Sequence, residues 1–130
     1  MLVVDATVAF DAAFDAIVFD RIRPMEPVGP PLLWSETVAA LRQAAFRGSV
    51  SDEEASTALS RFLSSPIERR SPRRLYPEAW ALAAQLGWAK TYDAEYIALA
   101  RLLNRPLLTT DARLRRRAAY LAEIIGPTEL

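Results

Sequence analysis

Short apolar runs that lead into an acidic residue recur along this chain of 130 residues. They are Leu2–Val4 before Asp5, Leu32–Trp34 before Glu36, and Leu107–Thr110 before Asp111. Runs of this length between helical patterns predict buried strands of a parallel sheet. The carboxyl ends of such strands share one edge of the sheet, where ligands bind. The sequence therefore predicts an α/β domain whose acids meet at one edge.

A fourth acid, Asp93, opens the apolar segment that runs to Ala100. It shares a helical stripe with Ile97 and Ala100, which predicts that Asp93 points inward and that Glu95 lies on the solvated side. Four carboxylates at one edge repel one another unless a cation lies among them. The pattern favours a site for a hard divalent ion, Mg²⁺ or Mn²⁺.

Two missing residue types narrow the possible chemistry. The chain has no His and no Cys, which excludes Ser-His-Asp triads, Cys-His pairs and zinc sites of the usual kind. Its four glycines stand alone, so there is no phosphate-binding Walker loop. An enzyme of this composition must use carboxylates, hydroxyls, Arg or the single Lys90.

Length and hydropathy predict one cytoplasmic domain over residues 1–130, with no membrane-spanning segment and no leader. The expected strands are 2–5, 32–34, 107–110 and 123–125, with a charged edge strand at 67–71. The expected helices cover 8–22 (one or two), 35–47 with Ser35 as N-cap, 51–64 with a capping box, 77–86, 92–104 and 111–120. The four prolines between Arg23 and Pro31 predict a loop.

Several residues have two readings at this level. Asp5 and Asp111 can each serve as the N-cap of the following helix instead of a metal ligand. The net charge is zero, but arginines cluster at 69–74 and 113–117, either as phosphate contacts or as solvated faces. Trp80 and Trp88 are expected in the core.

Four segments, in order, carry a family resemblance: Val4–Thr7, Leu33–Arg42, Tyr92–Ala100 and Leu108–Asp111. Together they resemble the successive motifs of PIN-domain ribonucleases, and most of all the VapC-type toxins of toxin–antitoxin pairs. The resemblance implies a three-layer α/β/α sandwich with a mainly parallel sheet. It also implies an endoribonuclease that depends on Mg²⁺ or Mn²⁺. The proline-rich region from Phe14 to Pro31 departs from the family pattern.

The resemblance further implies roles for individual residues. Asp5 and Asp93 would be the principal metal ligands, and Glu36 and Asp111 would complete a catalytic set of four. Thr7 and Thr109 match the family's hydroxyls beside the first and last acids and are expected to bind substrate. Arg113 and Arg116 are added to the substrate-binding set from their position on the helix that Asp111 opens, not from the resemblance. The implied partners are an RNA substrate, a small cognate antitoxin and a second copy of the chain in a homodimer. Segment 24–34 is a candidate antitoxin contact.

Three other readings stay open. A PIN-like domain could bind RNA or protein without catalysis, its acids serving only as caps. A nuclease outside toxin–antitoxin systems, acting on DNA or on structured substrates, would use the same acids. A receiver-like phosphoacceptor domain also places Asp at strand ends, but Lys90 is badly placed for its late-strand lysine.

Overall fold

Five short parallel strands form the single sheet of this protein, whose computed structural model describes residues 1–130. The order across the sheet is β3-β2-β1-β4-β5. The strands are β1 (Leu2–Val4), β2 (Pro27–Gly29), β3 (Glu68–Arg69), β4 (Leu107–Leu108) and β5 (Ile124–Ile125). The predicted α/β class with a parallel sheet is confirmed.

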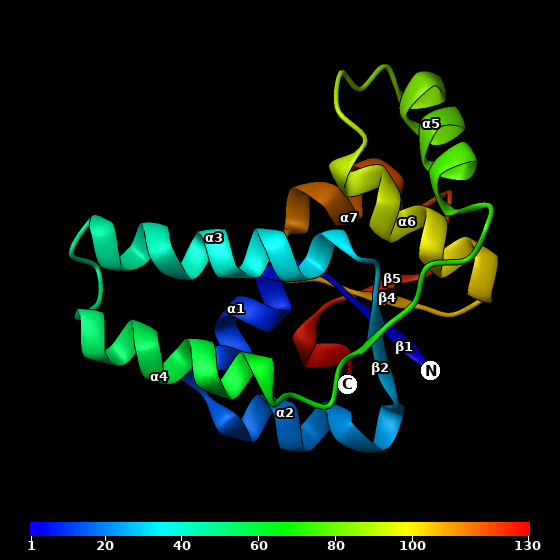
Figure 1. Ribbon diagram of the computed structural model, residues 1–130. Coiled ribbons are helices and arrows are strands. Elements are labelled where there is room, and N and C mark those ends of the chain that lie inside the picture. Colours follow the sequence, from blue (N-terminus) through cyan, green and yellow to red (C-terminus); the bar gives the residue numbers. More distant parts are fainter.

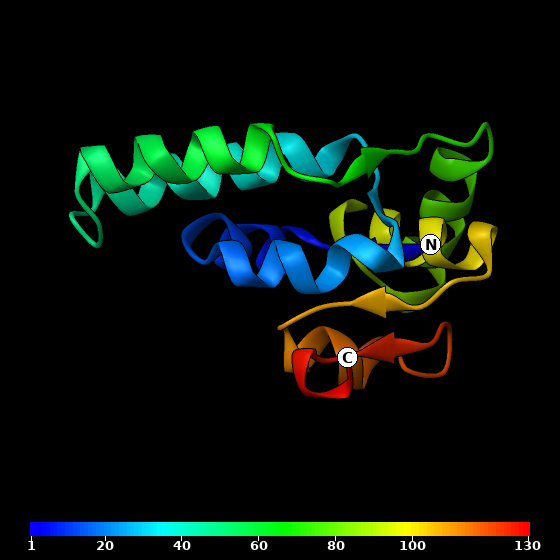
Figure 2. The same ribbon diagram turned by 90° about the horizontal axis from the view of Figure 1, so that it is seen from below.

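Seven α-helices flank the sheet: α1 (Ala6–Phe14), α2 (Ala16–Ile22), α3 (Leu32–Phe46), α4 (Asp52–Leu63), α5 (Leu75–Leu86), α6 (Tyr92–Leu103) and α7 (Ala112–Ala118). Two 3₁₀ turns, Arg23–Met25 and Pro127–Glu129, complete the chain. In Figure 1, α5 and α6 lie on one side of the sheet and α2 on the other. Helices α3 and α4 form an antiparallel pair that projects beyond the sheet (Figures 1 and 2). None of the helices is long and apolar enough to cross a membrane.

The central strand β1 anchors the core. All three of its side chains are buried, and α6 packs across β1 and β4. The ladder continues past the strand end, because the amide of Asp5 donates to the carbonyl of Leu108 at 3.3 Å. Asp5 is therefore held in place by the backbone of the sheet.

The second strand is the main error of the sequence reading. The segment predicted as a loop contains the 3₁₀ turn and the inner strand β2, whereas the predicted strand 32–34 is the first turn of α3. Pro27 is the first residue of β2, where a missing N–H costs little, and Pro31 has a helical φ of −51° before α3. Ser35 is consequently inside the helix and caps nothing. Residues 27–30 and Leu33 are buried and residues 24–26 are exposed, so it is the start of segment 24–34 that is fully open to an antitoxin.

Helix ends agree better with the sequence. The capping box of Ser51 and Glu54 is present at the start of α4, and β3 is the predicted exposed edge strand. Gly87 and Asn104 end α5 and α6 in the left-handed conformation. Trp80 was expected in the core but is 74% exposed on α5.

Gly29 allows α3 to pack closely on the sheet. A Cβ atom at this position would lie 2.5 Å from Cδ2 of Leu33, in the first turn of α3. Since Leu33 is fully buried, the missing side chain of Gly29 sets how near α3 comes to β2. That approach also positions Glu36, one turn further along α3.

Candidate active site

Asp5 is the most constrained acid of the site. It directly follows β1, caps α1 and is only 4% exposed. Its Oδ1 accepts hydrogen bonds from the amides of Thr7 (3.1 Å) and Val8 (3.2 Å) and from the Thr7 hydroxyl (2.5 Å). Its Oδ2 accepts one bond, from the Thr109 hydroxyl. Burial raises the pKa of Asp5, and these hydrogen bonds oppose the rise.

Two threonine hydroxyls connect Asp5 to the end of β4. The Thr109 hydroxyl also accepts from the amide of Asp111 at 3.0 Å, and the Thr7 hydroxyl accepts from the amide of Thr110 at 3.0 Å. Asp111 in turn caps α7 through the amides of Arg113 and Leu114. Asp5 and Asp111 are therefore confirmed as helix caps, and their role as metal ligands stays a prediction.

Glu36 reaches the site from α3, not from a strand end as predicted. It is half-buried, and its Oε1 accepts a 2.6 Å hydrogen bond from the hydroxyl of Tyr96 on α6. Burial raises the pKa of Glu36, the Tyr96 bond lowers it, and the charges of Asp93 and Asp5 raise it further. Tyr96 is 2% exposed, and its burial and its bond to Glu36 raise its own pKa. Sequence reasoning missed Tyr96, because a Tyr on an apolar helix carries no signal beyond core packing.

The two acids at the start of α6 lie the opposite way from the prediction. Asp93 is exposed, whereas Glu95 is 6% exposed and accepts a 3.2 Å hydrogen bond from the Thr91 hydroxyl. Partial desolvation and the charge of Asp111 raise the pKa of Asp93, which the charge of Arg117 lowers. Glu95 adds to the negative charge that acts on Glu36. Asp93 thus faces the solvent-accessible side of the acid set.

Mutual repulsion links all four predicted acids at the carboxyl edge of the sheet. Asp5 and Asp93 act on Glu36, and Asp111 acts on Asp93. No three carboxylates are close enough to form a ready-made metal cage. The donors nevertheless suit a hard divalent ion, because they are all carboxylate oxygens and Oδ2 of Asp5 accepts only one hydrogen bond.

The residues predicted to bind substrate have different surroundings. Arg113 and Arg116 are exposed on α7. Thr109 is 2% exposed with its hydroxyl engaged by Asp5 and Asp111, so it positions the acids and cannot contact RNA directly. Thr7 likewise donates to Asp5.

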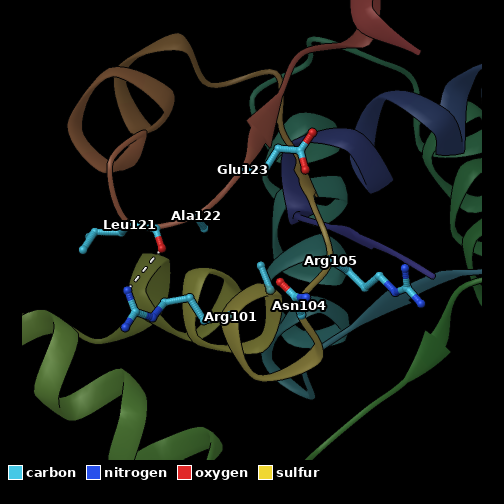
Figure 3. A pocket seen from close by; sticks show the side chains of 7 residues that line it. Arg101, Asn104, Arg105, Leu121, Ala122 and Glu123 are labelled. Carbon is cyan, nitrogen blue, oxygen red and sulfur yellow. Dashed lines mark hydrogen bonds between the residues drawn. The ribbon is translucent and has the colours of Figure 1, made fainter.

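A separate hollow lies at the opposite edge of the sheet, where β4 begins. It is lined by Ala100, Arg101, Asn104, Arg105, Leu121, Ala122 and Glu123 (Figure 3). The Arg101 guanidinium bonds to the carbonyl of Leu121 and to Glu78, so its charge is already paired. Without a cluster of acids, this hollow is not a candidate for the catalytic chemistry.

Comparison with known proteins gives matches over most of the chain. The family model described as "PIN domain" matches residues 2–120. The chain is 33% identical over 128 residues to Ribonuclease VapC12 of Mycobacterium tuberculosis, covering 95% of this chain and 97% of the relative. Among solved structures it resembles PAE2754 from Pyrobaculum aerophilum (TM-score 0.77, 24% identity, 98% and 91% of the two chains). It also resembles a chain of a toxin–antitoxin complex from Klebsiella pneumoniae (TM-score 0.64, 15% identity, 98% of both chains).

Proposed function

The chain belongs to the PIN-domain family, and from that premise we propose that it is an endoribonuclease that hydrolyses RNA with the help of Mg²⁺ or Mn²⁺. The observation that carries this proposal is the placement of four acids along the carboxyl edge of the sheet, where Thr109 bonds to both Asp5 and Asp111 and the charge of Asp93 acts on Glu36. The relative in Mycobacterium tuberculosis is named a ribonuclease, which supports RNA as the substrate.

Asp5 and Asp93 would hold the ion, with Glu36 and Asp111 completing the donor set. When bound, such an ion polarises a phosphoryl oxygen and lowers the pKa of a coordinated water. The contribution of the protein is to position the ligand oxygens. Thr7 and Thr109 fix both oxygens of Asp5. The four proposed ligands thus come from four different elements, and the fold fixes the position of each.

Glu36 is the candidate for proton movement. Tyr96 holds its Oε1, which leaves Oε2 free to accept a proton from an attacking water. Water adds to phosphorus as its proton passes to Oε2 of Glu36, the phosphodiester P–O bond breaks, and the leaving oxygen takes a proton from solvent.

We further propose that the chain is the toxin of a toxin–antitoxin pair and acts as a homodimer. The relative's VapC name and the fold shared with the Klebsiella pneumoniae complex support this role. Expression of the parent should slow bacterial growth, and a small cognate protein should relieve the effect. Normal growth despite abundant folded parent would contradict the toxin role but not the nuclease activity.

The direct test is cleavage of a labelled single-stranded RNA by purified protein with Mg²⁺, with Mn²⁺ or with EDTA. We expect cleavage with either metal and none with EDTA or with Asp93→Asn. Asp20→Asn, which changes an exposed acid on α2, should cleave as the parent does. A DNA of the same sequence tests the nuclease alternative. RNA that stays intact with both metals, or full activity of Asp93→Asn, would overturn the proposal.

A further inference from the structure

A second hollow, of about 510 Å³, adjoins the acids. Glu36 and Asp93 form part of its wall, and the remainder includes Trp88, Lys90, Tyr92 and Arg117, together with Gly87 and Ala89. Its volume lies within the roughly 300–1,000 Å³ typical of sites for small ligands. We refer to it as the aromatic–basic hollow. The proposed catalytic set thus borders a space large enough for part of a substrate.

Two aromatic rings line this hollow, and each has a cationic side chain next to it. The guanidinium carbon of Arg117 lies 4.9 Å from the ring centroid of Trp88, and Nζ of Lys90 lies 5.7 Å from that of Tyr92. Trp88 is half-buried, whereas Tyr92 is 49% exposed and so presents part of its ring to solvent. Cations placed near rings in this way are attracted to the π-electrons.

The two cations are also available to a ligand. Neither Lys90 nor Arg117 forms an ion pair, whereas Arg70, Arg101 and Arg115 each do. Arg117 is near enough to Asp93 to lower its pKa. Positive charge therefore stands directly beside the proposed metal-binding acids, on the side where Asp93 is exposed.

From this arrangement we propose that the aromatic–basic hollow binds one nucleotide of single-stranded RNA beside the bond that is cut. The base stacks on the ring of Tyr92, and Lys90 and Arg117 contact the flanking phosphates. Bases stack on exposed aromatic side chains whatever their identity, and phosphates require cations. The hollow combines both groups, next to the acids that would act on the phosphodiester. This role depends on the ribonuclease function proposed above.

Binding should be measured in EDTA, where no cleavage occurs, with a labelled single-stranded oligonucleotide. Tyr92→Ala should weaken binding roughly 5- to 150-fold, the effect of losing one stacked base. Tyr92→Phe keeps the ring and should bind like the parent. Tyr76→Ala is the matched control, because Tyr76 is 56% exposed on α5 and does not line the hollow.

The phosphate contacts are tested separately, by the salt dependence of RNA affinity. Lys90→Gln should reduce the slope of log affinity against log salt by about 0.7, the value for one phosphate contact on a single strand. Arg105→Gln, an exposed cation at the opposite edge, should leave the slope unchanged. An unchanged slope for Lys90→Gln would remove the proposed phosphate contact.

Removing bases from the RNA tests the site without altering the protein, so that misfolding of a variant cannot explain the result. Bases are removed one at a time from the oligonucleotide, and the cut position is mapped separately with metal. We expect one position next to the cut at which loss of the base weakens binding by the parent about as much as Tyr92→Ala does. That base should no longer matter in Tyr92→Ala, because its stacking partner is gone.

The outcomes separate the two proposals. If the parent cleaves RNA while Tyr92→Ala stays folded and binds as the parent does, the nucleotide site is wrong and the nuclease function stands. If no abasic position weakens binding, the site is also overturned. If RNA binds through Tyr92 but no metal permits cleavage, the nuclease function fails, and the placement of this nucleotide beside a cut bond fails with it.

Discussion

Asp93→Asn should remove most of the metal response of this protein without weakening its metal-free fold. Asp93 is exposed; the charges of Asp111 and Arg117 act on it, and its own charge acts on Glu36. Removing its charge relieves the repulsion with Asp111 and Glu36 and forfeits the attraction to Arg117. Exposed pairs are each worth about 0–1 kcal/mol, so these effects largely cancel. In EDTA the free energy of unfolding should stay within about 0.5 kcal/mol of the parent.

With metal the two proteins should diverge. An ion that binds only the folded state adds about 2.7 kcal/mol at a concentration of 100 Kd. Loss of an outer contact to a metal ligand already costs 10- to 100-fold in affinity, so we take about 100-fold for a ligand itself. The same concentration then equals Kd and adds only about 0.4 kcal/mol. The difference of about 2.3 kcal/mol corresponds to roughly 9 °C in Tm for a chain of this length.

Thermal unfolding of the parent, Asp93→Asn and Asp20→Asn, each in EDTA and in Mn²⁺, measures this difference. Asp20→Asn should respond to Mn²⁺ as the parent does, since Asp20 is an exposed acid on another helix. The reasoning is refuted if Asp93→Asn gains as much from Mn²⁺ as the parent, or if it unfolds far earlier in EDTA. The second result would make Asp93 a structural residue.

Three further outcomes are expected. Tyr96→Phe removes a bond that lowers the pKa of Glu36, so the acid limb of the pH–rate profile for RNA cleavage should move to higher pH. Thr37→Val should raise the free energy of unfolding in urea by about 1 kcal/mol, because the Thr37 hydroxyl is buried without a partner. Burial raises the pKa of carboxyls such as Asp5 and Glu36, so their protonation stabilises the fold. That contribution is complete below their ordinary pKa values of 3.8 and 4.5 and is lost as pH rises through the raised ones. In EDTA, Tm should therefore fall as pH rises above the ordinary pKa values of these carboxyls, and saturating Mn²⁺ should abolish this fall.

The helices were predictable because local chemistry specifies their ends. Ser51 and Glu54 form their capping box without help from the remainder of the fold, and Gly87 ends α5. Strand β2 was not predictable in this way. It has only three residues. Its one proline, Pro27, opens the strand, and Pro31 lies outside it at the start of α3, where a proline is also tolerated. What makes Pro27–Gly29 a strand is its place between β1 and β3, which no local pattern contains.

The acid set was predictable by residue type but not in its orientation. The helical stripe of Asp93, Ile97 and Ala100 can identify the buried face of α6 only if another face of the helix is exposed to solvent. In α6 every residue from Ala94 to Ala100 is buried, so periodicity carries no direction there. Asp93 is exposed because it precedes the fully buried part of the helix, which begins at Ala94. Glu95 lies within that part and is therefore buried.

The hydrogen bonds of Asp5 have a consequence for how this activity can be lost in evolution. Asp5 joins β1, the start of α1 and the end of β4, so its removal disturbs folding as well as any reaction. Asp93 has no comparable structural role. Descendants released from selection for cleavage should therefore lose Asp93 early and retain Asp5 for long. Asp5 alone would then be a poor marker of an active family member, and the residue at position 93 a good one.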